Sequence, residues 1–298
     1  MNTSRYKKAL NAYIKNHATL SALASLIANK DCSQLDLVNA SEFSQSAVAL
    51  LPMISDENDG AEFNSAVSKY FISETAGRIV FILCGYSASG KDTLASYVNH
   101  LLYMQCKEFT YTKKYTTRAQ RGNEGANQAG SRAEPSGNYE YFDRVSEFPA
   151  DSSLNYSLYG HYYALSGDDL KSTLIEDKYQ MCIYGKLENI HEVRQKLFLE
   201  HKRLPFTILI NSKADNCEGR IIRRHSMTDE EQIIRVKEMK RQAEFLSKNT
   251  VFVETAFDLV IDNSDTHAVD NSSRKLADFI SEKMIWAQKT AESGYRNH

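Results

Sequence analysis

The chain has 298 residues, of which 42% are hydrophobic and 25% charged, and its formal net charge is −2 at pH 7. This length fits one large domain or a medium domain with an appendage. The near-neutral charge excludes a bulk electrostatic attraction to nucleic acid or to an anionic membrane, so we expect neither as a partner.

The cysteines and the apolar runs point to a cytoplasmic protein. The five cysteines are widely spaced, without a C-x-x-C pair or a zinc-like spacing, and two of them fall in predicted strands, which is typical of reduced thiols. No apolar run approaches the roughly twenty residues that span a bilayer, and residues 1–10 lack the apolar core of a signal peptide. The cysteines are Cys32, Cys84, Cys106, Cys182 and Cys217.

Residues 1–76 carry apolar side chains at three- and four-residue steps, which predicts a helical N-terminal module. This segment contains no cluster of ligating residues and no chemical motif. We expect it either to pack on the rest of the protein or to mediate dimerisation or binding of a protein partner.

The stretch from Ile79 to Val98 combines a buried strand, a glycine-bracketed loop and a helix. Ile79 to Cys84 is an unbroken apolar run, and Gly85 and Gly90 bracket a loop that ends in Lys91. This is the pattern of a P-loop, in which backbone N–H groups and the helix N-terminus face a phosphate while the lysine reaches the β- and γ-phosphates. The predicted phosphate-binding residues are Gly85, Ser87, Ala88, Ser89, Gly90, Lys91, Asp92 and Thr93.

The residue after Lys91 is an aspartate, where a P-loop usually has Ser or Thr. A carboxylate at this position could hold Mg²⁺ or its water shell, with the next hydroxyl beside it. We therefore expect Asp92 and Thr93 to form the metal site.

Behind the P-loop helix, β-forming residues from Phe109 lead to Arg118 and Arg121, which are spaced to form an anion clamp at the end of a strand. Residues 122–137 are small, polar and rich in glycine, which predicts a loop. Several aromatic residues follow, and they could either stack on a planar base or fill the core of a small β-sheet. These are Tyr139, Tyr141, Phe142, Tyr156, Tyr159, Tyr162 and Tyr163.

The rest of the chain alternates helices and strands, which predicts an α/β fold with a parallel sheet covered by helices on both faces. Thr228 and Glu231 form a capping box at the start of a long helix. The expected strands are 179–183, 205–211 and 257–261, and the expected helices are 168–176, 189–201, 214–225, 229–247 and 274–288.

Several of these segments together resemble the guanylate kinase family: Gly-Tyr-Ser-Ala-Ser-Gly-Lys-Asp-Thr, Tyr-Thr-Thr-Arg-Ala-Gln-Arg-Gly-Asn-Glu, Tyr-Gly-His-Tyr-Tyr-Ala and Arg-Ile-Ile-Arg-Arg-His-Ser-Met-Thr-Asp-Glu-Glu. The resemblance covers roughly residues 77–285. It implies a P-loop NTPase core within a kinase domain at 77–298, with an NMP-binding region at about 109–165 and a lid at about 215–240. It also implies ATP–Mg²⁺ as the phosphoryl donor.

The resemblance also implies roles for single residues. Arg118, Arg121, Glu124, Tyr139, Tyr141 and Tyr163 match positions that bind the acceptor, and Asp262 and Asn263 fall near the adenine edge. The catalytic set that it implies is Lys91, Arg118, Arg220, Arg224 and Arg235.

Some positions depart from the guanylate kinase pattern. Leu154 and Asn155 stand where an acidic residue reads the guanine edge, and Tyr184 and Lys186 replace an aspartate pair. The Gly-Lys-Asp sequence and Gly185 are more similar to ribose 1,5-bisphosphate phosphokinase, whose acceptor has no base.

These features predict an ATP-dependent phosphotransferase for a small phosphorylated acceptor, with a nucleoside monophosphate favoured. Because an acceptor phosphate is already a nucleophile, no catalytic base is required. The alternatives are a sugar-phosphate kinase and a nucleotide-binding interaction module without turnover.

Overall fold

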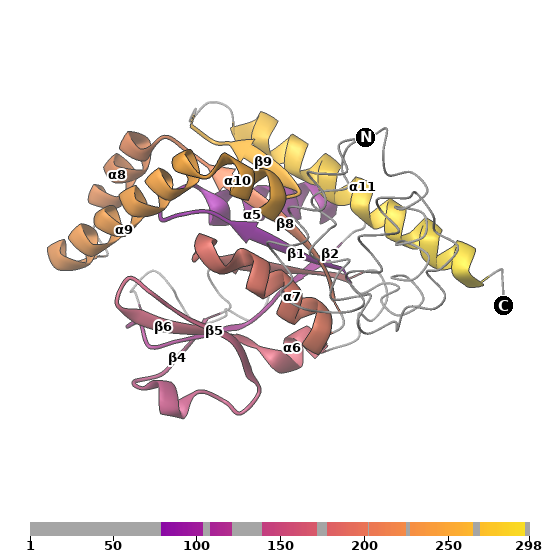
Figure 1. Ribbon diagram of the computed structural model, residues 1–298, viewed down its shortest axis with the longest axis horizontal. Coiled ribbons are helices and arrows are strands. Elements are labelled where there is room, and N and C mark those ends of the chain that lie inside the picture. Colours follow the sequence, from indigo (N-terminus) through magenta and orange to yellow (C-terminus); the bar gives the residue numbers. More distant parts are fainter. Residues whose placement is uncertain are drawn as a thin grey trace.

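The computed structural model describes residues 79–103, 108–120, 139–171, 178–201, 203–224, 227–264 and 269–295, which form two sheets and the helices around them (Figure 1). The predicted N-terminal module, the glycine-rich loop and the candidate residues Arg121 and Glu124 lie outside these ranges. In the part of the chain that is described, no helix is long and apolar enough to cross a bilayer.

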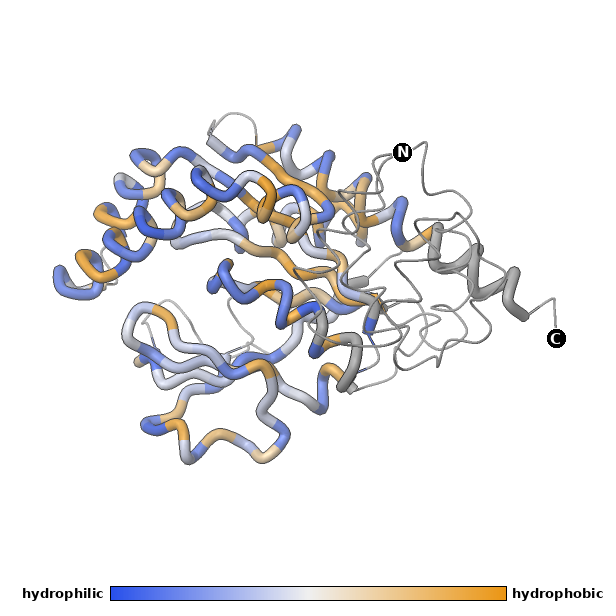
Figure 2. Tube along the Cα trace, in the orientation of Figure 1, coloured by the Kyte–Doolittle hydropathy of each residue, from blue (hydrophilic) through white to orange (hydrophobic). Residues whose placement is uncertain are grey.

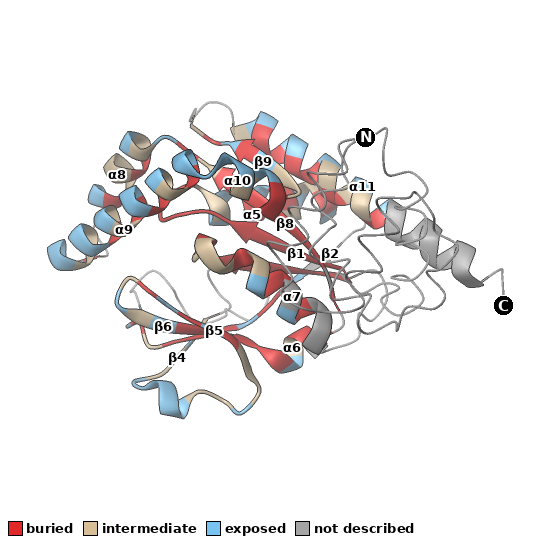
Figure 3. Cartoon of the chain, viewed as in Figure 1, coloured by how far each residue is buried: buried red, intermediate tan, exposed pale blue. Residues whose placement is uncertain are grey.

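The larger sheet has five strands in the order β2-β7-β1-β8-β9, and every pair of neighbours is parallel. This confirms the parallel sheet that the sequence predicts. All six residues of the central strand β1 are buried, which explains its uninterrupted apolar run (Figures 2 and 3). The strands are β1 (Ile79–Cys84), β2 (Glu108–Tyr111), β7 (Lys178–Tyr184), β8 (Leu204–Asn211) and β9 (Leu259–Asp262).

Helices cover both faces of this sheet. On one face, Val80, Ile82 and Cys84 of β1 belong to the same core as residues of α7, while α5 and α11 contact β1 from the other face (Figure 1). Helix α8 packs against α9, and α9 against α10. The helices are α5 (Lys91–Tyr103), α6 (Gly167–Lys171), α7 (Ile190–His201), α8 (Ala214–Ile222), α9 (Asp229–Lys248), α10 (Thr250–Ala256) and α11 (Val269–Tyr295).

The second sheet has four strands in the order β4-β3-β6-β5, of which β3 and β4 are parallel and the other pairs antiparallel. Its outer face carries Tyr115, whose ring contacts Phe142 and Phe148, so part of the aromatic sequence forms a small sheet core. The strands are β3 (Lys114–Thr116), β4 (Tyr139–Tyr141), β5 (Ser152–Leu158) and β6 (His161–Ser166). Two short 3₁₀ helices, Val145–Glu147 and Leu187–Asn189, complete the secondary structure.

The helix start predicted at Thr228 is confirmed, since the Thr228 hydroxyl accepts a hydrogen bond from the Glu231 N–H at 3.2 Å. The sequence did not predict helix α10 at all. Its β-branched residues favour a strand locally, but the Phe252 ring packs between Phe245 and Phe257, and this tertiary contact decides the conformation. Helix α11 is also longer at both ends than the predicted 274–288.

Candidate phosphate-binding site

The loop between β1 and α5 curls as the sequence predicts. Gly85, Ala88 and Gly90 have positive φ angles of 153°, 60° and 97°. The Lys91 ammonium donates hydrogen bonds to the carbonyl oxygens of Gly85 at 2.6 Å and Tyr86 at 2.9 Å, which holds the lysine across the loop. The first N–H groups of α5, like those of any helix, lack acceptors within the helix, so they are available to an anion at the helix N-terminus.

Close packing explains the two glycines. A Cβ atom on Gly85 would come within 2.6 Å of the Ile210 carbonyl oxygen, and one on Gly90 would come within 2.2 Å of the Asn263 side-chain nitrogen. That nitrogen donates a hydrogen bond to the Ser89 carbonyl oxygen at 2.8 Å, so Asn263 holds the loop from the side of β9.

We expect Gly90→Ala to destabilise the protein more than the matched change Gly160→Ala. Both glycines have positive φ, which costs an alanine about 1–2 kcal/mol, but Gly160 has open space around its Cα. Gly90→Ala must also displace Asn263, which should remove at least about 1 kcal/mol more, the usual cost of a broken buried hydrogen bond. Urea unfolding of both variants measures this difference. Equal losses would contradict the packing described for Gly90.

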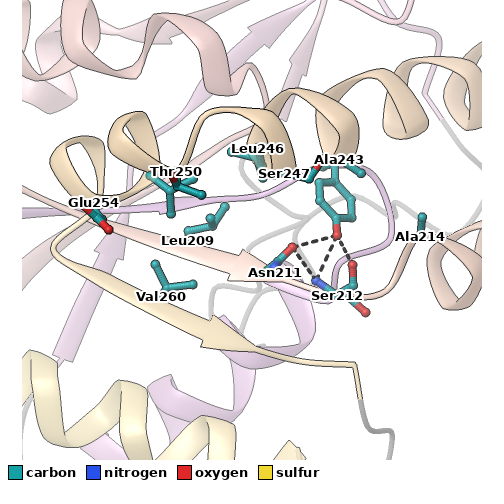
Figure 4. A pocket seen from close by; sticks show the side chains of 12 residues that line it. Leu209, Asn211, Ser212, Ala214, Ala243, Leu246, Ser247, Thr250, Glu254 and Val260 are labelled. Carbon is teal, nitrogen blue, oxygen red and sulfur yellow. Dashed lines mark hydrogen bonds between the residues drawn. The ribbon is translucent and has the colours of Figure 1, made fainter.

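Tyr86 anchors the back of the loop. Its hydroxyl lies 2.9 Å from the Asn211 side-chain oxygen and accepts a hydrogen bond from the Ser212 N–H at 3.1 Å (Figure 4). Burial raises the pKa of Tyr86 to about 12, so the phenol stays protonated. A cavity of about 440 Å³ opens beside this contact, but its lining contains no lysine or arginine among the described residues, and mainly apolar side chains such as Leu246 and Val253 surround it.

A second cavity, of about 170 Å³, lies in front of the loop. The loop and the start of α5 form one wall, and the end of β7 and the smaller sheet form another. In an open parallel sheet, ligands bind at the carboxyl ends of the strands, and this cavity occupies that position beside β1 and β7. Its charged lining residues are Lys91, Asp92, Lys114, Arg118, Arg224 and Arg235.

This cavity is strongly cationic, because five lysine or arginine side chains meet only one carboxylate among the described residues that line it. Burial lowers the pKa of Lys91 to about 8, and Asp92 partly offsets this effect. Two further charges act on the same ammonium, since Lys114 and Arg224 both lower its pKa. A desolvated cation of this kind gains most when an anion comes to lie beside it.

The affinity for a triphosphate should therefore fall at alkaline pH. A lysine with a pKa of about 8 is mostly protonated at pH 7 and mostly neutral at pH 9, so the dissociation constant should rise about tenfold across this interval. Calorimetric titration with a non-hydrolysable ATP analogue at both pH values measures the change. A Lys91→Met variant should lack this pH dependence, and an identical dependence in the variant would contradict the role of Lys91.

The structure brings most of the predicted acceptor residues together. The Arg118 guanidinium is buried and lies over the rings of Tyr139 and Tyr141, at 5.3 and 5.5 Å from their centroids. The Tyr163 ring stacks on Tyr156, with 5.3 Å between centroids. Arg118, Tyr139 and Tyr163 line the cavity, whereas Tyr141 contacts it through Arg118.

The predicted lid arginines come from α8, α9 and the turn between them. Arg224 and Arg235 line the cavity, and Arg235 also binds Glu231 at 2.9 Å and lies 4.4 Å from the centroid of Tyr159. Arg220 does not line the cavity. It donates a hydrogen bond to the Ala88 carbonyl oxygen at 3.1 Å, so it connects α8 directly to the loop.

Of the residues expected near an adenine, Asp262 ends β9 and Asn263 follows it. The Asp262 carboxylate accepts a hydrogen bond from the Ser264 N–H at 2.9 Å, and the Asn263 amide is committed to Ser89. Their role toward a base stays a prediction.

The sequence reasoning missed Lys114 entirely, and it named Tyr156 and Tyr159 only as general aromatics. All three line the cavity. The alternation of strand residues predicts only that Lys114 and Thr116 share one face of β3, and it does not indicate which face meets the cavity.

Asp92 and Thr93 fit the predicted magnesium site in their chemistry. Both line the cavity directly after Lys91, and both offer oxygen ligands. No group of three or more His, Cys, Asp or Glu side chains that could enclose a metal occurs in the described ranges. A Mg²⁺ ion that arrives with phosphates needs only one or two protein carboxylates, so the residues present are sufficient.

Comparisons with known proteins give matches among solved structures but none by sequence. No protein family and no curated protein matches the sequence. Among solved structures, the chain is similar to the crystal structure of guanylate kinase from Anaplasma phagocytophilum, with 13% identity and a TM-score of 0.43, over 70% of this chain and 87% of that one. We therefore base the function on the loop and the cavity.

Proposed function

We propose that the protein is a P-loop phosphotransferase that moves the γ-phosphoryl group of ATP–Mg²⁺ to a small phosphorylated acceptor, with a nucleoside monophosphate favoured. The observation that carries this proposal is the convergence of five cationic side chains on one cavity between the P-loop and the smaller sheet. Phosphoryl transfer asks a protein mainly for positioning and for stabilisation of charge on the transferring group.

The residues divide into two ends of one site. At the donor end, the N–H groups of the loop and Lys91 bind the triphosphate. Asp92 and Thr93 would hold Mg²⁺, which would supply positive charge to neutralise the phosphates. At the acceptor end, Arg118 grips the acceptor phosphate with its planar fork of donors. Arg224 and Arg235 approach from the α8–α9 side and stabilise charge that develops between the two ends.

The transfer needs no protein base. An oxygen of the acceptor phosphate forms a bond to the γ-phosphorus, and the bond from that phosphorus to the β–γ bridging oxygen breaks, so its electron pair leaves with ADP. The cavity should also exclude water, which limits hydrolysis of ATP.

Two observations bear on the acceptor. The tyrosines that line the cavity, including the stacked pair Tyr156 and Tyr163, suit a planar base and favour a nucleotide. Asp92 is the only carboxylate in the described lining, and Leu154 is buried where a guanine-reading acid would stand, which favours the alternative of a sugar phosphate without a base.

The direct test is phosphoryl transfer with the full-length protein. γ-Labelled ATP, Mg²⁺ and a panel of acceptors are incubated with the wild type and with Lys91→Met. The panel holds the nucleoside and deoxynucleoside monophosphates, ribose 5-phosphate, ribose 1,5-bisphosphate and a short oligonucleotide. We expect label transfer to a small phosphorylated acceptor that depends on Lys91. Binding of ATP without transfer to any acceptor would reject the enzyme and leave a nucleotide-binding interaction module.

A further inference from the structure

Lys114 is a buried cation at the acceptor end. It belongs to β3, where the register places it opposite Tyr139 of β4 and Leu165 of β6, on the face of the smaller sheet that meets the cavity. Only 5% of the residue is exposed to solvent. Its neighbour Lys113 points to the other face and is half exposed.

The two lysines differ in their partners. The Lys113 ammonium forms an ion pair with Glu140 at 3.4 Å. The Lys114 ammonium instead contacts Tyr139, with its nitrogen 3.4 Å from the hydroxyl oxygen and 5.1 Å from the ring centroid. Within the described ranges, Lys114 makes no ion pair of 4 Å or less with any carboxylate.

A second cation shares the same ring. The Arg118 guanidinium lies 5.3 Å from the centroid of Tyr139, so two positive charges gather on one phenol. Burial, and to a smaller extent Arg118, lowers the pKa of Lys114, and Asp92 raises it. A phenol ring offsets only a small part of the cost of burying an ammonium. The arrangement is therefore costly until an anion enters between these side chains.

We infer that Lys114 is a specificity-determining residue that binds a second anionic group of the acceptor, separate from the phosphate that Arg118 grips. This rests on the proposed phosphotransferase activity, but among small phosphorylated acceptors it favours those with two anionic groups over a nucleoside monophosphate, which carries one phosphate. An acceptor with two anionic groups is distinguished from its singly phosphorylated analogue because only the doubly anionic one also brings a negative charge to the Lys114 ammonium. A singly phosphorylated acceptor would leave the Lys114 ammonium desolvated beside a neutral phenol.

Matched acceptor pairs test this inference. A nucleoside 5′-monophosphate is compared with its 3′,5′-bisphosphate, and ribose 5-phosphate with ribose 1,5-bisphosphate. In at least one pair, the wild type should prefer the doubly phosphorylated member at least tenfold in kcat/KM, and Lys114→Met should abolish the preference by raising KM with kcat little changed. Lys113→Met should keep the preference, and Lys114→Arg should restore most of it. A preference unchanged in Lys114→Met, or a wild-type preference for the single phosphate in both pairs, would overturn the inference.

A binding measurement separates this inference from the proposed function. The full-length protein is saturated with a non-hydrolysable ATP analogue and Mg²⁺, and inorganic pyrophosphate or inorganic phosphate is then titrated by calorimetry. Pyrophosphate should bind at least tenfold more weakly to Lys114→Met than to the wild type, while the affinity for phosphate changes less. If the wild type transfers phosphate to no acceptor but this difference in pyrophosphate affinity is observed, the anion site at Lys114 is supported and the proposed phosphotransferase activity is rejected. Equal pyrophosphate affinities would overturn the anion site.

The stability of the ligand-free protein is a third test. It distinguishes a lysine that binds an anion from a lysine that stabilises the fold. Because methionine removes a buried charge and keeps most of the length of the side chain, Lys114→Met should raise the urea midpoint of the ligand-free protein. A lower midpoint would mean that Lys114 supports the sheet, and it would contradict the inference.

Discussion

Replacing Lys91 with methionine should lower kcat/KM for phosphoryl transfer by about a thousandfold, which corresponds to about 4 kcal/mol of transition-state stabilisation. Lys91 lies across the loop and borders the cavity, so its ammonium is placed to contact phosphates that bind at the loop. Methionine keeps much of the side-chain volume but cannot stabilise negative charge. Initial rates at varied ATP and acceptor concentrations measure the loss.

The matched control for this variant is Lys275→Met. Lys275 is an exposed residue of α11, away from the cavity, and its replacement should leave the rate within about twofold, as is usual for surface changes. Urea unfolding of both variants shows that the folds are intact. A Lys91→Met enzyme with more than a tenth of the wild-type rate would mean that the loop does not bind the reacting phosphates.

Arg118→Met should lower kcat/KM for the acceptor by about a hundredfold, or about 3 kcal/mol, and leave the affinity for the ATP analogue within about twofold. Arg118 is buried against Tyr139 and Tyr141, lines the cavity, and donates one hydrogen bond to the Ala119 carbonyl oxygen at 3.2 Å. The loss should appear mainly in KM for the acceptor if the contact is made equally in the ground state and the transition state.

Arg223→Met is the control for Arg118. Arg223 is exposed at the end of α8, where its side chain donates a hydrogen bond to the Gly219 carbonyl oxygen at 3.0 Å, and it does not line the cavity. Its replacement should change neither kinetic constant by more than about twofold. If Arg118→Met lost binding of the ATP analogue but kept binding of the acceptor, Arg118 would belong to the donor end, which would contradict its assignment to the acceptor.

The sequence predicts the central sheet well because its strands are buried on both faces. Runs such as Ile79–Cys84 contain no polar residue, and the glycine-bracketed loop that follows β1 is typical of a P-loop. Helix α9 was also predictable, since its start is encoded locally by Thr228 and Glu231. These features depend on neighbours in sequence, so the sequence alone is sufficient.

Features that depend on contacts between distant segments were not predictable. Lys114 is one residue from an ordinary surface lysine, and only the pairing of β3 with β4 and β6 sends it inward. Asn263 was expected near a base, and its contact with Ser89 joins residues 174 positions apart. Helix α10 has strand-like residues and forms because of aromatic packing.

The loop is connected to the elements around it at several points. Tyr86 is joined to the end of β8, Ser89 to Asn263 after β9, and Ala88 to Arg220 of α8. The α8–α9 side of the cavity therefore contacts the loop directly. A movement of the segment that carries Arg224 and Arg235 can change the position of the phosphate-binding loop.

The measurement that tests the central claim most directly is calorimetric binding of a non-hydrolysable ATP analogue with Mg²⁺ to the full-length wild type and to Lys91→Met. If the loop from Gly85 to Lys91 is a triphosphate site, the wild type binds one equivalent, and the variant binds at least about 30-fold more weakly, a loss of about 2 kcal/mol. Absence of binding to the wild type, or equal affinity in the two proteins, would contradict the claim that this loop binds a nucleoside triphosphate.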